Sequence, residues 1–159
     1  MVAIIFILLI VFQIKHFLAD YPLQNEFMLG KFKDKGWVIP LATHAGVHAW
    51  ATFWVSSMFF TGTGTGFRGL GICISLALLD FTVHFIVDRI KASSKLLGRF
   101  KALSALEWNS LNVHPGFTDK DRMNAIRSNK YFWWSLGADQ MAHHLTHYLI
   151  IYLILKFSF

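Results

Sequence analysis

Four long apolar segments constrain the fold of this chain more than any other feature. They cover roughly residues 2–19, 38–60, 69–90 and 133–157. A helix that crosses the hydrocarbon core of a bilayer needs about 20 mainly apolar residues, and each segment reaches that length. With 55% hydrophobic residues, the chain of 159 residues is also too apolar for an ordinary soluble domain. The sequence therefore predicts an all-α fold, a single integral membrane domain built as a four-helix bundle.

Basic residues predict how this bundle is oriented. They gather in the two connections that follow the first and third spans, whereas the opposite side has only Arg68 and Lys156. By the positive-inside rule both basic connections are cytoplasmic and both termini lie outside. We therefore expect a multi-pass protein of the inner (cytoplasmic) membrane, and we read the net charge of +6 as topology rather than nucleic-acid binding.

The first span could be mistaken for a signal peptide, but its sequence differs from one. It has no basic segment before it, and it continues into Gln13, Lys15 and His16 without a small-residue cleavage pattern, so we expect it to be retained.

Gly64, Gly66 and Gly69 match G-x-G-x-x-G, but no strand precedes them, which excludes a dinucleotide-binding turn.

The connection over residues 91–132 is predicted to be partly helical. Residues 95–108 place apolar side chains at helical spacing with basic ones elsewhere, which is typical of an amphipathic helix in the membrane interface. Thr118 and Asp121 form an Asp variant of the capping box and predict a second short helix. The aromatic residues 131–134 then form a belt where the fourth span enters the bilayer.

Every span carries histidine or aspartate residues four positions apart, and this spacing places them on one helix face. With alternating directions, all four sets fall in the cytoplasmic half of the bundle. The ten predicted metal ligands are His16, Asp20, His44, His48, Asp80, His84, Asp88, Asp139, His143 and His147. Gln24 and Gln140 are predicted to hydrogen-bond these ligands.

The cost of burying charge favours a metal. An aspartate near the bilayer centre costs about 2.5–3.5 kcal/mol, and Lys15 is the single lysine that we expect in the same half of the membrane. Two divalent cations would neutralise the four carboxylates, and ten donors would give each about four ligands. Mixed His and Asp donors suit Zn²⁺, which we favour, with Mn²⁺ or Fe²⁺ as alternatives. Cys73 is the only cysteine, which excludes a cysteine-rich site.

A second interpretation, which needs no metal, also stays open. The same ten side chains could form a polar network between helices without any metal. His144 is expected to face lipid headgroups or a neighbouring residue, although its spacing to His147 also allows a place in the site. His114 is expected to be an ordinary loop residue, with covering the site as the alternative.

The segments "HFLADYPLQ", "THAGVHAW", "DFTVHFIVDRIK" and "WWSLGADQMAHHLTH" resemble the signature segments of a small family of bacterial and phage membrane proteins, domain of unknown function 3307. The similarity covers nearly the whole chain and implies four membrane helices, but the family supplies no activity. Its motif positions correspond to His16, Asp20, Gln24, His44, His48, Asp80, His84, Asp88, Asp139, Gln140 and His143. We add His147 from its spacing alone.

A weaker similarity is to membrane-bound metal-dependent hydrolases and, through them, to zinc phospholipase C and P1-type nucleases. These proteins also build multinuclear sites from H-x-x-x-D and H-x-x-x-H pairs on helices. The phospholipases and nucleases use a free N-terminal tryptophan as a ligand, whereas this chain begins with Met-Val, so one metal position of that pattern lacks its ligand here.

Three functions follow from these features. The first is a metal-dependent hydrolase that acts on a phosphoester or an anionic lipid-like substrate at the cytoplasmic face, with Asp88 or Asp20 as general base. The second is a metal or proton transporter or sensor, although the outer halves of the spans are so apolar that an oligomer would have to complete the path. The third is a non-catalytic interaction module held together by a structural metal. The expected partners are the lipid bilayer, the substrate and a second copy of the chain.

Overall fold

The computed structural model describes residues 2–60, 66–100, 118, 123–124 and 127–158, and this part of the chain is all-helical. Its four long helices are α1 (Val2–Asp20), α3 (Val38–Phe60), α4 (Gly66–Ala92) and α7 (Lys130–Ser158). Shorter elements lie between them: α2 (Glu26–Leu29) and the 3₁₀ turns η1 (Gly30–Phe32) and η2 (Leu97–Arg99). The all-α fold class predicted from the sequence is confirmed.

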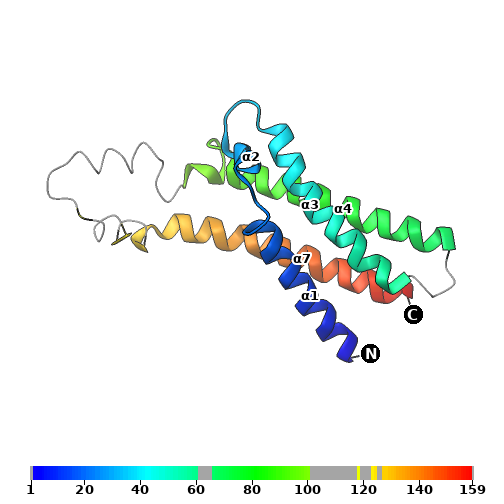
Figure 1. Ribbon diagram of the computed structural model, residues 1–159. Coiled ribbons are helices and arrows are strands. Elements are labelled where there is room, and N and C mark those ends of the chain that lie inside the picture. Colours follow the sequence, from blue (N-terminus) through cyan, green and yellow to red (C-terminus); the bar gives the residue numbers. More distant parts are fainter. Residues whose placement is uncertain (1, 61–65, 101–117, 119–122, 125–126, 159) are drawn as a thin grey trace.

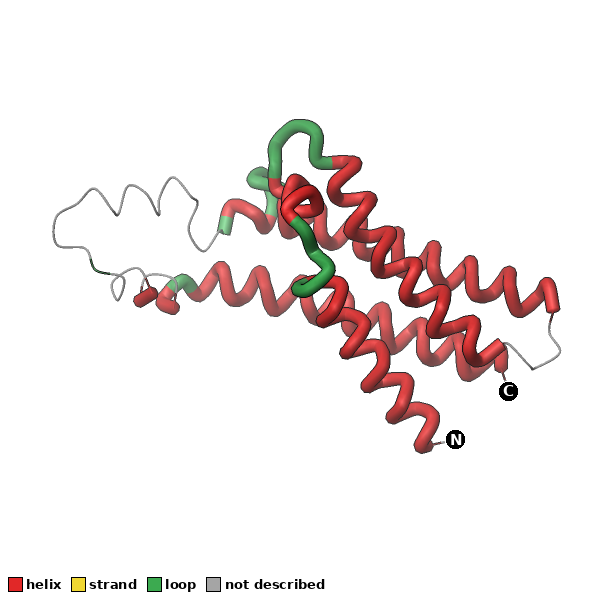
Figure 2. Tube along the Cα trace, viewed as in Figure 1, coloured by secondary structure: helices red, strands yellow, loops and turns green. Residues whose placement is uncertain are grey.

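The four long helices form a bundle in which each runs opposite to the next along the chain (Figure 1). α3 and α4 pack against each other along most of their length, α4 also packs on α7, and α1 bridges α3 and α7 (Figure 2). The N-terminus and the C-terminus therefore lie at the same end of the bundle (Figure 1).

The helix boundaries follow from local backbone chemistry. The Asn25 side chain accepts a hydrogen bond from the Met28 amide at 3.0 Å, which caps the start of α2. Pro40 lies in the first turn of α3, where the missing amide hydrogen costs no helical hydrogen bond. α4 begins at Gly66, whose φ of 50° is the left-handed conformation that glycine adopts without strain.

The two ends of the bundle have opposite chemistry. The end that holds both termini contains a packed apolar cluster of Leu8, Phe12, Leu76, Ile150, Ile151 and Ile154. The other end contains the buried histidine, aspartate and lysine side chains. This division arises because the polar residues come late in α1 and α4 but early in α3 and α7, and neighbouring helices run in opposite directions.

Two helices of the described chain, α1 and the one that begins at Gly66, are long and apolar enough to cross a membrane by length and composition. α3 and α7 correspond to the other two predicted spans as helices, but the histidines of α3 and the histidines and aspartate of α7 lower their apolar content. The four-helix membrane bundle therefore stays a prediction for these two helices.

The predictions for the long connection mostly fall outside the described residues. Leu97–Arg99 forms a single 3₁₀ turn at the start of the expected amphipathic helix, and residues 101–117 are not described. His114 and Asp121 belong to the same undescribed part of the chain, as does most of the second short helix.

Candidate metal centre

The structure brings all ten predicted ligands into one cluster between the four long helices. Each helix supplies its set from one face, because residues four apart in an α-helix lie one above the other. Nine of the ten side chains are buried, and Asp20 at the end of α1 is the partly exposed one.

Within the described residues, four groups of three side chains have one ligand atom each within 4.8 Å of the others. The groups are His16/His48/His84, Asp20/His44/His48, Asp80/His84/His147 and Asp88/Asp139/His143. Every predicted ligand belongs to at least one group, and His48 and His84 each belong to two. Such spacing is what three ligands of one ion require, since metal–ligand bonds are about 2.0–2.3 Å long.

Three lysines enter the same cluster, and this corrects the sequence-based expectation of a single one. Lys15 donates to Asp80 Oδ2 at 2.5 Å, Lys31 to Asp88 Oδ2 at 2.8 Å, and Lys91 to Asp139 Oδ2 at 2.6 Å. Lys31 and Lys91 are hard to predict from the sequence because Lys31 lies in the turn η1 and Lys91 lies in the last turn of α4. A lysine stem of four carbons lets the ammonium group reach several ångströms into the bundle from there.

His84 lies at the centre of the cluster. Its ring stacks on His48 with centroids 3.8 Å apart and on His143 at 4.1 Å. Its Nδ1 donates to the backbone carbonyl oxygen of Asp80 at 3.0 Å. Because a carbonyl can only accept, this bond fixes the Nδ1-protonated tautomer in the neutral ring and leaves a lone pair on Nε2.

Asp20 connects two further rings. His48 Nε2 donates to Asp20 Oδ1 at 3.1 Å, and His16 Nε2 lies 3.2 Å from Asp20 Oδ2. A carboxylate that holds the protonated nitrogen of a histidine orients the opposite nitrogen for a metal. Asp20 is thus placed to support histidine ligands as well as to be one.

The two glutamines predicted to support the ligands differ in outcome. Gln140 accepts from His16 Nε2 at 3.1 Å and donates to Asp139 Oδ2 at 3.1 Å, so it joins α1 to α7 inside the cluster. Gln24 lies beyond the end of α1 at Asp20 and does not share its helix face. Among the hydrogen bonds of the described residues, none joins the Gln24 side chain to the cluster, and its supporting role stays a prediction.

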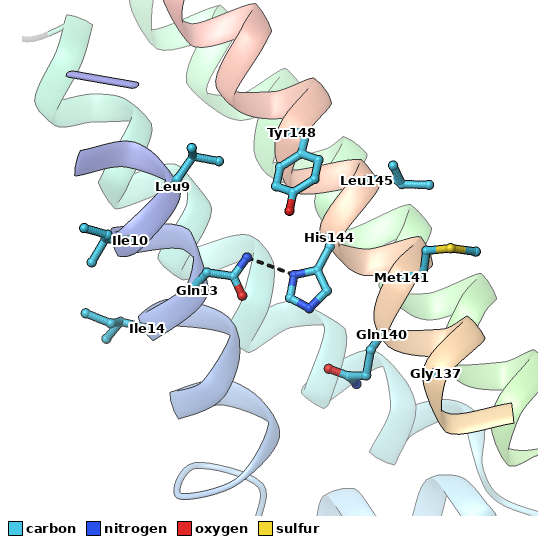
Figure 3. Close-up of a pocket in the computed structure, with 10 residues that line it drawn as sticks. All are labelled: Leu9, Ile10, Gln13, Ile14, Gly137, Gln140, Met141, His144, Leu145 and Tyr148. Atoms are coloured by element: carbon cyan, nitrogen blue, oxygen red, sulfur yellow. Dashed lines mark hydrogen bonds between the residues drawn. The ribbon is translucent and has the colours of Figure 1, made fainter. Parts of the chain in front are cut away.

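A groove of about 770 Å³ runs between α1 and α7 beside the cluster (Figure 3). Its lining is mostly apolar and includes Ile10 and Ile14 of α1 and Met141 and Leu145 of α7. Polar groups interrupt these walls. Gln13 Nε2 donates to His144 Nδ1 at 2.9 Å across the groove, and Gln140 lies along it (Figure 3). His144 therefore contacts a neighbouring helix, one of the two surroundings that the sequence predicts for it.

Comparisons with known proteins give no assignment: no protein-family model, no curated protein and no solved structure matches this chain.

Proposed function

We propose that this chain is a multi-pass membrane protein that binds a divalent metal ion and uses it to hydrolyse a phosphoester of an anionic, lipid-like substrate at the cytoplasmic face. The observation that carries the proposal is the convergence of ten histidine and aspartate side chains from four helices. They form groups of three in which one ligand atom of each residue lies within 4.8 Å of the others. A bound divalent ion would lower the pKa of a coordinated water toward about 7 and polarise the phosphoryl oxygen. Zn²⁺ suits these donors best, and Mn²⁺ or Fe²⁺ would accept the same set.

The groove between α1 and α7 supports the lipid-like substrate. Its apolar walls suit an acyl chain, and Gln140, which lines the groove, is hydrogen-bonded to His16 of the cluster. A substrate whose chain lay in the groove would bring its polar head toward the metal ligands. The basic residues of the connections would then attract an anionic headgroup.

The contacts favour Asp20 over Asp88 as the general base. Lys31 holds the Asp88 carboxylate with an ammonium hydrogen bond at 2.8 Å, which stabilises the charged form and makes it a weaker base. Within the described chain, no lysine lies in salt-bridge distance of Asp20, and its side chain is 15% exposed compared with 5% for Asp88. Asp20 is therefore better placed to take a proton from water.

The apolar end of the bundle argues against transport. Leu8, Phe12, Ile150 and Ile154 are fully buried there and fill the space between the helices. A transported ion would have to cross this region without a carboxylate or imidazole, at the large cost of a charge in an apolar medium. A polar path through a single copy of the described bundle is therefore absent.

One observation favours a second function, that of a non-catalytic interaction module whose fold is stabilised by a structural metal. Structural metal sites are closed, whereas catalytic sites keep a position open for water or substrate. His44, His48, Asp80, His84 and His147 are fully buried, which fits a closed site. Under this alternative the ion would bind and stabilise the fold without turning over any substrate.

Metal analysis followed by a substrate screen tests the proposal. Detergent-purified wild type would be compared with His84→Ala and Asp139→Ala by elemental analysis. We expect stoichiometric metal in the wild type and reduced metal in His84→Ala. The loaded protein should then release product from vesicles that contain an anionic phospholipid or from a soluble aryl phosphodiester. Stoichiometric metal without any turnover would establish the structural alternative, and wild-type protein without metal would leave only the polar network.

A further inference from the structure

The lysines divide the four ligand groups into two kinds. Lys15 occupies the Asp80 group, where it donates to Asp80 and also lies 3.4 Å from His147 Nε2. In the Asp88 group, Lys31 donates to Asp88 and Lys91 donates to Asp139. In the part of the chain that the structure describes, no lysine contacts a member of the His16/His48/His84 or Asp20/His44/His48 group.

Charge balance points to a single divalent ion rather than the two expected from the sequence. Three of the four aspartates in the cluster have an ammonium partner, and within the described chain Asp20 is the one without such a partner. Two divalent ions added to this set would leave a buried excess of positive charge, and they would face ammonium groups at close range. One ion leaves the smaller imbalance and so the smaller desolvation cost.

The hydrogen bonds of three histidines select the position of that ion. His16 and His48 each direct Nε2 to an oxygen, on Gln140 and on Asp20, and His84 directs Nδ1 to the Asp80 carbonyl. The opposite nitrogens, His16 Nδ1, His48 Nδ1 and His84 Nε2, are buried and have no hydrogen-bond partner among the residues that the structure describes. In neutral rings each of these nitrogens has a lone pair, and a buried lone pair without a partner is costly unless something binds it.

The other three groups differ from this one in the partners of their members. In the Asp80 group, Lys15 already donates to the carboxylate and lies beside His147, and in the Asp88 group both carboxylates accept from lysine. In the remaining group, Asp20 accepts the proton of His48 Nε2, so this nitrogen is turned into a donor. Asp80 Oδ1 and His147 Nδ1 are also buried without a hydrogen-bond partner among the described residues, but Lys15 lies beside both side chains. The group of three imidazoles is the one in which every member has such an acceptor atom and none has a lysine partner in the described part of the chain.

We infer that one divalent cation binds to His16, His48 and His84, with Asp20, Gln140 and the Asp80 backbone fixing the three rings, and that Lys15, Lys31 and Lys91 act as permanent counter-cations for the other carboxylates. The inference rests on the proposed metal-binding function and gives the ion its position. Three neutral imidazoles with a fourth position for water are an established ligand set for catalytic zinc. Asp20 and Gln140 then orient the ligand rings from the side opposite the ion, and for Asp20 this role replaces that of general base.

Cobalt binding to the full-length protein in detergent tests this position. Co²⁺ replaces Zn²⁺ in such sites and reports its ligands through visible absorption. We expect one Co²⁺ per chain with the intense absorption of a four-coordinate, nitrogen-rich site. His16→Gln and His48→Gln should each weaken binding by at least about 100-fold, and Asp20→Asn by about 10–100-fold, the usual range for a residue that orients a ligand.

Two matched controls separate this site from its neighbours. His144→Gln removes an imidazole that contacts Gln13 in the groove, and the double variant Lys91→Met/Asp139→Asn removes a neutral ion pair from the Asp88 group. Both should retain one Co²⁺ per chain with affinity within a few-fold of wild type. Circular dichroism and size-exclusion chromatography of each variant would show that it is folded before its metal content is interpreted.

The outcomes distinguish this inference from the proposed function. Two Co²⁺ per chain would overturn the inference, and so would binding that survives in folded His48→Gln but is lost in Lys91→Met/Asp139→Asn. In both cases metal binding itself would stand. Wild-type protein that binds no Co²⁺ or Zn²⁺ would overturn both. One ion held by the three histidines, with no phosphoester hydrolysed, would contradict only the hydrolase.

Discussion

Lys15 shows how a single residue makes a buried carboxylate tolerable. Its ammonium lies 2.5 Å from Asp80 Oδ2, and the two side chains are 3% and 0% exposed. Thr52 Oγ1 donates to the same oxygen at 2.6 Å. The position is effective because Lys15 precedes His16 on α1, so the helix that brings a ligand into the cluster also brings a counter-charge beside it.

We predict that Lys15→Met lowers the free energy of unfolding by about 3–5 kcal/mol, because it leaves a buried carboxylate without its counter-charge. The double variant Lys15→Met/Asp80→Asn should recover much of that loss. Unfolding in a denaturing-detergent titration gives the measurement. Lys33→Met, at an exposed position, is the control and should change stability by less than about 0.5 kcal/mol. Equal effects for Lys15→Met and Lys33→Met would show that Asp80 does not depend on Lys15.

Residue spacing alone predicted the histidine and aspartate members of the cluster. The i, i+4 pairs identify the inward face of each helix, and helix direction then places the pairs at one depth. Lys31 and Lys91 could not be predicted in this way. Lys31 lies in the turn η1 and Lys91 lies after the apolar run of α4, and only the folded backbone shows that their side chains turn inward.

At the scale of elements, α1 depends on its contacts with α4 and α7. Phe12 is fully buried between Leu8, Leu76 and the isoleucines of α7, one turn before the polar cluster begins. It also packs on His147, with ring centroids 5.3 Å apart. The apolar cluster thus fixes the position of α1 and with it the depth of His16 and Asp20.

Phe12→Ala should therefore destabilise the protein by about 3–5 kcal/mol through the cavity it leaves. Phe17→Ala lies on the same helix but removes a side chain that is 57% exposed, and it should cost far less. Thermal unfolding followed by circular dichroism compares the two. If the two variants melted together, α1 would not be held by this cluster.

The fold of the elements was predictable where the apolar runs are long. The four predicted spans correspond to α1, α3, α4 and α7, with ends that differ by a few residues because caps and glycines, rather than hydropathy, set the boundaries. α2 and η1 were not predicted. They are short turns in a polar loop, and Asn25 is the one local signal for them.

At the scale of the whole molecule, the predicted place of the bundle in a bilayer depends on the composition of its four long helices. α1 and the helix that begins at Gly66 have the length and composition of membrane spans. α3 and α7 have the length, but their inward faces carry the cluster. A polar face turned toward the bundle interior is compatible with a membrane helix, because its neighbours rather than lipid surround it.

Cysteine labelling tests this topology. Cys73 is the only cysteine of the sequence, so Cys73→Ser provides a background without a native thiol. We expect Lys33→Cys to react with a membrane-impermeant maleimide only from the cytoplasmic side and Arg68→Cys only from the outside; both positions are exposed. Labelling of both cysteines from one side would contradict a four-span topology, because they lie on opposite ends of α3.

The sequence by itself determined that the chain is helical and which histidine and aspartate side chains share a site, because helical period and apolar length are local properties. The tertiary structure alone decided how that site is balanced. It brings lysines from α1, the turn η1 and the end of α4 onto three aspartates, and it leaves one nitrogen of each of three neighbouring imidazoles buried without a hydrogen-bond partner among the described residues. Both results depend on side-chain reach and on ring orientation across helices, and these are set by packing between distant parts of the chain rather than by spacing along it.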